Sequence, residues 1–120
     1  MSTNNSRPVR AISIRQPYVE QIFRRIKWRE YRSRPTRIRE RVFIYAALKP
    51  AIWPQEWRKV RKHPGDLPRG GILGTVEIVD CRFDRRTGNY AYVLRGARRF
   101  RRRRRAVNQP TPCFWRPRFC

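Results

Sequence analysis

The sequence contains few acidic residues, a single histidine and few cysteines. Only 8 Asp and Glu accompany 31 Lys and Arg, so the 120-residue chain carries a formal net charge of +23. His63 and three cysteines without a C-x-x-C pair do not show the ligand spacing of a zinc site. The odd number of cysteines also disfavours a disulfide framework. We therefore expect free thiols, no metal and no cofactor.

Long apolar stretches are absent as well. No run of about 20 apolar residues is available to span a bilayer, and residues 1–8 lack the apolar core of a signal peptide. There is also no basic amphipathic helix of useful length for binding to a membrane surface. The sequence therefore predicts no membrane partner and a cytoplasmic location.

The positive charge, nearly all of it arginine, indicates a polyanionic partner. A phosphate backbone binds such a surface through counterion release, and clustered guanidinium groups add bidentate phosphate contacts that lysine cannot make. RNA or another nucleic acid is therefore the expected partner. The alternative is that an arginine-rich proteome accounts for most of the excess, and such a surface would still bind nucleic acid weakly.

The length and composition fit one folded domain. A second core within 120 residues would bury too little apolar surface, whereas 39% hydrophobic and 12% aromatic residues are enough for one packed core. We expect a flexible tail over residues 1–8 and a single domain over residues 9–120.

Hydrophobic periodicity predicts several strands and one early helix. Strands are predicted over residues 9–14, 28–32, 41–48, 72–81 and 90–94. Pro17 suits the first turn of a helix. The apolar face of that helix comprises Val19, Ile22, Phe23 and Ile26, and the opposite face comprises Glu20, Arg24 and Arg25. Without regular βαβ alternation, these elements predict an α+β fold, a small mixed β-barrel with the early helix packed on it.

An arginine run occupies residues 98–105. Its members are Arg98, Arg99, Arg101, Arg102, Arg103, Arg104 and Arg105. Like charges this close together repel one another, and a bound polyanion would relieve that cost. We interpret the run as an arm that grips a nucleic-acid backbone, and a merely solvated charged stretch is the alternative.

Three segments of the chain resemble one protein family. Residues 11–18 read AISIRQPY, residues 26–32 read IKWREYR, and residues 71–81 read GILGTVEIVDC. Together they resemble the ASCH family, and the PCFW at residues 112–115 looks like that family's last strand. The resemblance implies a β-barrel related to RNA-binding PUA domains, with a cleft between barrel and first helix. Family members are proposed RNA binders, and some branches are reported as ribonucleases or as amidohydrolases of acylated cytidine.

The matching positions imply a cleft formed by Ser13, Gln16, Lys27, Glu30 and Arg32. Alternation along a strand places Glu30 and Arg32 on one face, with Lys27 in the turn before it. Such a group can bind a phosphate or a base edge, or use Lys27 as a catalytic base that Glu30 orients. The amidohydrolase branch has a threonine where this chain has Glu30. A purely structural ion-pair network is the alternative.

The sequence therefore leaves three alternative functions. The first is an RNA-binding module whose ligand contacts include Ser13, Gln16, Arg32 and the arginine run. The second is a ribonuclease or nucleoside amidohydrolase with Lys27 and Glu30 as catalytic residues. The third is a regulatory domain that binds a nucleotide metabolite.

Several other residues are assigned structural roles. Glu77 lies on a partly buried strand face and is expected to have a structural partner. His63 lies in a polar loop and is expected to be solvated. The tryptophans considered are Trp53, Trp57 and Trp115. Tryptophans in so small a domain usually belong to the core, and base stacking is the alternative.

Overall fold

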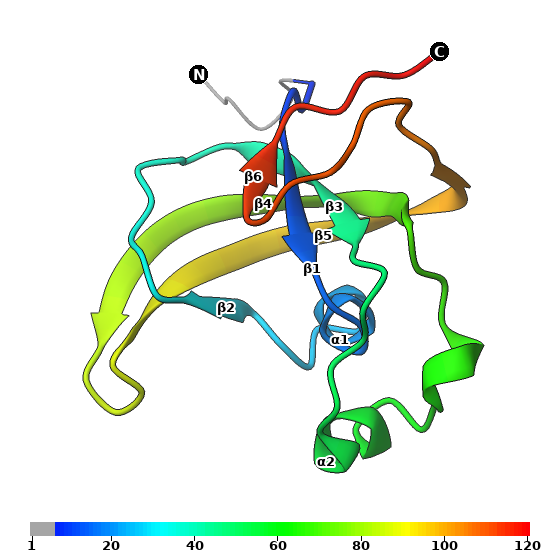
Figure 1. The fold of residues 1–120 in the computed structure, drawn as a ribbon. Helices are drawn as coiled ribbons and strands as arrows, with labels where there is room; N and C mark the ends of the chain where they lie inside the picture. Colours follow the sequence, from blue (N-terminus) through cyan, green and yellow to red (C-terminus); the bar gives the residue numbers. More distant parts are fainter. Residues whose placement is uncertain (1–6) are drawn as a thin grey trace.

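The computed structural model describes residues 7–120, which form a six-stranded mixed sheet and two short α-helices (Figure 1). The elements in chain order are β1 (Ala11–Ile14), α1 (Tyr18–Phe23), β2 (Arg29–Arg32), β3 (Arg41–Ala46), α2 (Pro54–Arg58), the 3-10 helix η1 (Pro64–Asp66), β4 (Gly71–Asp84), β5 (Asn89–Arg104) and β6 (Phe114–Trp115). The flexible tail predicted over residues 1–8 falls largely outside the described residues. Arg7 and Pro8 are described and form no regular secondary structure.

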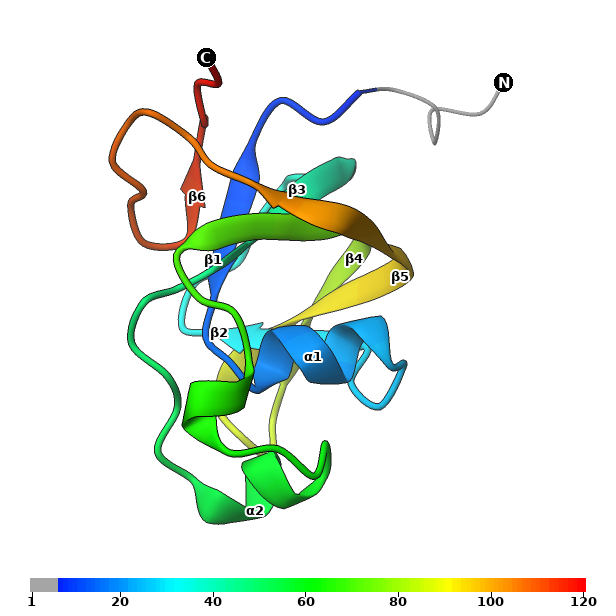
Figure 2. The same cartoon turned by 90° about the vertical axis from the view of Figure 1, so that its right-hand side faces the viewer.

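The strands follow the order β2-β5-β4-β3-β1-β6 in the sheet. β1 and β3 run parallel, and the other neighbours are antiparallel. A parallel pair needs a long crossover connection, which the segment carrying α1 and β2 supplies. The long strands β4 and β5 form a curved hairpin over α1 (Figures 1 and 2). None of the helices in residues 7–120 has the length and apolar character needed to cross a membrane.

The prediction of a mixed β-barrel is wrong in one respect, because the sheet does not close. β2 and β6 are its two edges. β2 pairs with β5 and β6 pairs with β1, and within residues 7–120 no ladder joins β2 to β6. A side-chain hydrogen bond from Arg32 to the backbone of Ser13 spans the opening between β2 and β1 instead. The mixed sheet and the early helix are confirmed.

The main core lies between α1 and the face of the sheet that curves over it (Figure 2). Its buried side chains include Ile12, Ile14, Val19, Ile22, Val42, Ile44, Val76, Ile78, Tyr92 and Leu94. Gly74 allows Phe23 to pack directly on β4, since a Cβ at this position would lie 2.7 Å from the Phe23 ring. The helical face predicted from Val19, Ile22 and Phe23 therefore positions α1 on the sheet.

Two elements end at residues other than those predicted. α1 stops at Phe23 because the chain turns at Arg25, whose φ of 62° is left-handed, and Ile26 is left exposed. β5 continues far beyond Leu94 and contains most of the arginine run. The run is therefore not a free arm: Arg98, Arg99 and Arg104 pair with β4, the register is irregular between Arg99 and Arg104, and the arginine side chains are exposed.

Glu20 is a buried carboxylate, although the helical pattern placed it on the exposed face. The residue is 6% exposed. Its carboxylate accepts hydrogen bonds from Arg24 Nε at 2.7 Å and from Arg99 Nη1 at 2.8 Å. Burial alone would raise the pKa of Glu20, but the hydrogen bonds and charges of Arg99 and Arg24 outweigh it and hold the pKa below its ordinary value. Glu20 thus fastens α1 to β5.

We expect Glu20→Gln to lower the free energy of unfolding by roughly 2 kcal/mol at neutral pH, because a buried carboxylate with charged donors is worth about that much. The pKa of Glu20 is lower in the folded protein than the ordinary 4.5. The carboxylate therefore stabilises the fold fully above the ordinary value, and this contribution is lost as the pH falls through the folded pKa. Denaturant unfolding over a pH series should show the wild-type advantage shrinking in acid.

Glu40→Gln provides the matched control. Glu40 pairs with Arg10, and these two side chains are 34% and 29% exposed, whereas the Glu20 side chain is 8% exposed. Surface ion pairs contribute little to stability. Equal losses of stability in the two variants would contradict the role assigned to Glu20.

Candidate functional site

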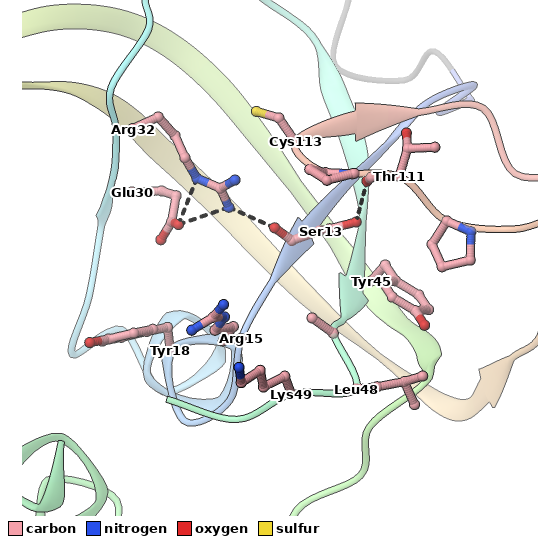
Figure 3. A pocket seen from close by; sticks show the side chains of 13 residues that line it. Ser13, Arg15, Tyr18, Glu30, Arg32, Tyr45, Leu48, Lys49, Thr111 and Cys113 are labelled. Carbon is pink, nitrogen blue, oxygen red and sulfur yellow. Dashed lines mark hydrogen bonds and ion pairs between the residues drawn. The ribbon is translucent and has the colours of Figure 1, made fainter. Parts of the chain in front are cut away.

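The cavity that contains Ser13, Glu30 and Arg32, called the main cavity below, lies where the sheet remains open, between β1 and β2 (Figure 3). Its volume is about 480 Å³. The walls come from β1, α1, β2, the chain around the end of β3, and the loop before β6. Its polar lining residues include Ser13, Arg15, Tyr18, Glu30, Arg32, Tyr45, Lys49 and Thr111. Four separate stretches of chain thus contribute polar groups to one opening.

Arg32 shapes this cavity through contacts in two directions. Its Nε donates to Glu30 Oε2 at 3.0 Å, and its Nη2 donates to the backbone carbonyl of Ser13 at 2.6 Å. Ser13 Oγ in turn donates to the carbonyl of Thr111 at 3.0 Å. Figure 3 shows these groups as one continuous chain of bonds across the cavity. β1 and β2 share no backbone ladder, so these side-chain hydrogen bonds link the two strands directly.

Glu30 is the central acidic group and serves two cavities. It is 7% exposed, and its Oε1 lies 3.6 Å from Lys27 Nζ. The Lys27 ammonium also lies over the rings of Tyr18 and Tyr31, at 4.9 and 5.4 Å from their centroids. Lys27 lines a second cavity of about 520 Å³, whereas Glu30 and Tyr18 line both. The structure thus brings Lys27, Glu30 and Arg32 together, with Glu30 between two cations.

Gln16 is not among the residues that line the main cavity. Its side chain is fully buried. The amide Nε2 donates to the carbonyl of Pro68 at 3.1 Å, and Oε1 accepts from the backbone N–H of Glu20 at 3.1 Å. Both ends of the amide are therefore engaged by the fold, and Gln16 joins the start of α1 to the loop before β4.

Arg15 and Lys49 are cavity cations that the sequence analysis missed. Both are exposed, and neither forms an ion pair within residues 7–120. Arg15 directly follows β1, and Lys49 follows shortly after β3. Since β1 and β3 are parallel neighbours, their carboxyl ends lie at the same edge of the sheet. A prediction of that parallel pair would have brought these two residues together.

Tyr18 adds a hydroxyl group between the two cavities. Burial raises the pKa of Tyr18, the negative charges of Glu56 and Glu30 raise it further, and Arg15 opposes them. The phenol therefore stays neutral at physiological pH and retains its O–H as a donor. Residues 7–120 contain no cluster of three or more His, Cys, Asp and Glu side chains suited to a metal ion.

The arginine run lines no part of the main cavity, and its members divide into two groups. Three are engaged by the fold. Arg99 pairs with Glu20, Arg103 donates to the carbonyl of Arg69, and the Arg104 guanidinium lies 3.8 Å from the centroid of Phe119. Within the described residues, no side-chain hydrogen bond, ion pair or aromatic contact is made by Arg98, Arg101, Arg102 or Arg105. This second group, called the free arginines of β5 below, comprises three residues of β5 and Arg105, which directly follows the strand. The group is free to contact a ligand.

The remaining predicted roles are resolved by burial and contacts. Glu77 is paired with Arg95 at 3.3 Å, which confirms a structural partner. His63 is exposed, as expected. Trp57 and Trp115 are buried, whereas Trp53 is 54% exposed. Trp28, which the sequence analysis did not consider for stacking, has the same exposure of 54%.

A comparison with known protein families finds a match to the ASCH domain over residues 12–102. This range extends from β1 through most of β5 and contains Ser13, Lys27, Glu30 and Arg32. A comparison with curated proteins finds no match.

We expect Arg32→Lys to lower the free energy of unfolding by roughly 1 to 2 kcal/mol, because one ammonium group cannot donate in the two fixed directions used by the guanidinium. Thermal or denaturant unfolding measures this loss. Arg34→Lys is the matched control, since the Arg34 side chain is exposed and has no partner within residues 7–120. Similar stability for both variants would contradict the bridging role of Arg32.

Proposed function

The chain belongs to the ASCH domain family, and we propose that it binds RNA through two separate elements. The main cavity would hold a base or nucleotide, and the free arginines of β5 would contact the phosphate backbone. ASCH domains are PUA-like domains often linked to RNA binding. The observation that carries the proposal is the set of cations without acidic partners, at the cavity and on β5.

The cavity supplies groups that suit a nucleotide. Arg15 and Lys49 offer cationic donors for a phosphate, and neither is neutralised by a carboxylate. Glu30 offers an acceptor for the amino group of a base, and Arg32 offers N–H donors for ring nitrogens and carbonyl oxygens. RNA-binding domains commonly read unstacked bases in this way. Base recognition is therefore assigned to the cavity.

The free arginines of β5 suit contacts to the phosphate backbone, which do not read the bases. The side chains of these arginines are exposed, and none has a hydrogen-bond, ion-pair or aromatic partner within the described residues. Guanidinium contacts to phosphates position a nucleic acid but carry no sequence information. The cavity and β5 are therefore expected to contribute separately, the first to preference among RNAs and the second to general affinity.

The test is a titration of single-stranded RNA at several salt concentrations. Wild-type affinity should fall steeply with salt, because bound counterions are released. Replacing Arg101, Arg102 and Arg105 with Ser should weaken binding to all RNA sequences equally. It should also reduce the salt slope by about 2, given about 0.7 per single-strand phosphate contact. The variant should keep the preference of the parent among a panel of RNAs.

The matched control replaces Arg37, Arg85 and Arg86 with Ser. These residues are exposed and lie outside the arginine run, and their replacement removes the same charge. Equal effects of both triple variants would mean that net charge alone drives binding. Undetectable RNA binding at low salt would overturn the proposal itself, and binding of free nucleotides without RNA would favour the regulatory domain that takes a nucleotide metabolite.

Hydrolysis is the second candidate function, because it would use Lys27 and Glu30, which lie next to each other with 3.6 Å between Nζ and Oε1. A general base needs a free lone pair, whereas the Lys27 ammonium is engaged by a carboxylate and two aromatic rings. We therefore expect no turnover of RNA or acylated cytidine above the rate without protein, measured by chromatography. Turnover that Lys27→Ala and Glu30→Gln both abolish would instead establish a hydrolase.

A further inference from the structure

We propose that Trp28 is a stacking platform for a base of the bound RNA, next to the nucleotide held in the main cavity. This inference rests on the proposed RNA binding. It assigns a position to a second nucleotide and identifies the ligand of that position as a planar base on a single strand. Four features of Trp28 support it.

The first feature is an open aromatic surface. Trp28 is 54% exposed, although the Arg29 guanidinium lies 4.2 Å from the centroid of its ring. Arg29 thus covers part of the indole, and more than half of the residue remains accessible. Tryptophan at such exposure contributes little to a core. A cation stacked on one face of an indole leaves the other face for a base, the arrangement that single-strand binders use.

The second feature is a fixed backbone. The carbonyl of Trp28 accepts a hydrogen bond from the N–H of Leu94 at 2.9 Å. Just before it, the N–H groups of Ile26 and Lys27 donate to the carbonyl of Gln21, at 2.9 and 3.2 Å. Trp28 is therefore held between α1 and β5. An anchored platform loses less conformational freedom on binding than a mobile one.

The third feature is position. Trp28 lines the second cavity together with Tyr18 and Glu30, which also line the main cavity. Trp28 also lines a smaller cavity of about 290 Å³. A strand leaving the main cavity across Tyr18 and Glu30 therefore reaches Trp28 next. The indole lies on the path between the first nucleotide and the open surface.

The fourth feature is the charge around the indole. The two cavities that Trp28 lines contain five cations, of which Lys27, Lys59 and Arg95 are paired with carboxylates. Arg25 and Arg29 form no ion pair within residues 7–120 and can contact the phosphates that flank a stacked base. The buried Nε of Arg29 has no hydrogen-bond partner in the described structure. The surroundings of Trp28 thus fit a nucleic-acid strand better than an apolar peptide.

Trp53 provides a matched control with the same exposure of 54%. It immediately precedes α2, and it does not line the main cavity or either cavity beside Trp28. Within the described residues, no cation lies over its ring. Removing Trp53 therefore tests the general effect of losing an exposed indole.

The experiment measures the affinity of the full chain for a single-stranded RNA. Trp28→Ala should weaken binding by roughly 5- to 150-fold, the range given by loss of one base–aromatic stack. The salt slope should stay unchanged, because no phosphate contact is removed. Trp28→Phe should retain most of the affinity, whereas Trp28→Leu should not, and Trp53→Ala should bind like the wild type.

A fluorescence measurement provides a second test. In Trp53→Phe, Trp28 is the exposed tryptophan, because Trp57 and Trp115 are buried. Stacking of a base should quench its emission, and the quenching should be absent in Trp28→Phe. If wild-type protein binds RNA but Trp28→Leu and Trp53→Ala bind equally well, this inference is overturned while RNA binding stands. If wild-type protein binds no RNA, both proposals fall.

Discussion

The side chain of Arg32 links two strands of this sheet that no backbone hydrogen bonds join. β1 and β2 are not neighbours in the sheet. The Arg32 guanidinium contacts Glu30 on β2 and the carbonyl of Ser13 on β1. A planar group with fixed donors can hold two elements at a defined distance without filling the space between them. Between β1 and β2 a side-chain hydrogen bond takes the place of a backbone ladder, and the main cavity lies in this opening. The bridge adds to the strand pairing that places Ser13 opposite Tyr45 on β3 and Glu30 opposite Tyr92 on β5.

The scarcity of carboxylates explains why some arginines form ion pairs and most do not. With 8 acidic side chains for 31 Lys and Arg, most cations cannot be neutralised within the chain. Glu20 and Glu30 are each shared by two cations at sites where the fold needs a fixed contact. Arg10, Arg82 and Arg95 pair with other acidic side chains, and most of the remaining arginines form no ion pair within residues 7–120 and repel one another. The few acidic side chains thus form structural contacts, and the unpaired cations are available to bind a polyanion.

Parts of the fold and site were predictable because they depend on local patterns. The helix face of Val19 and Ile22, the strand pairing Glu30 with Arg32, and the buried strand at β3 follow from periodicity. The burial of Glu20 did not follow, because its partner Arg99 lies far along the chain on a strand longer than predicted. Gln16 was expected to face a ligand, yet it bonds Pro68 and the backbone of Glu20.

The sequence by itself determined the charge, the family and the composition of the central ion-pair cluster, since these depend on residue identity and short spacing. Only the tertiary structure decided that the sheet stays open and that Arg15 and Lys49 share a cavity. It also decided that four arginines of the run lack partners and that Trp28 is exposed beside Tyr18 and Glu30. The physical reason is that these features arise from contacts between distant segments. Strand pairing and side-chain bridges determine such contacts, and local periodicity does not encode them.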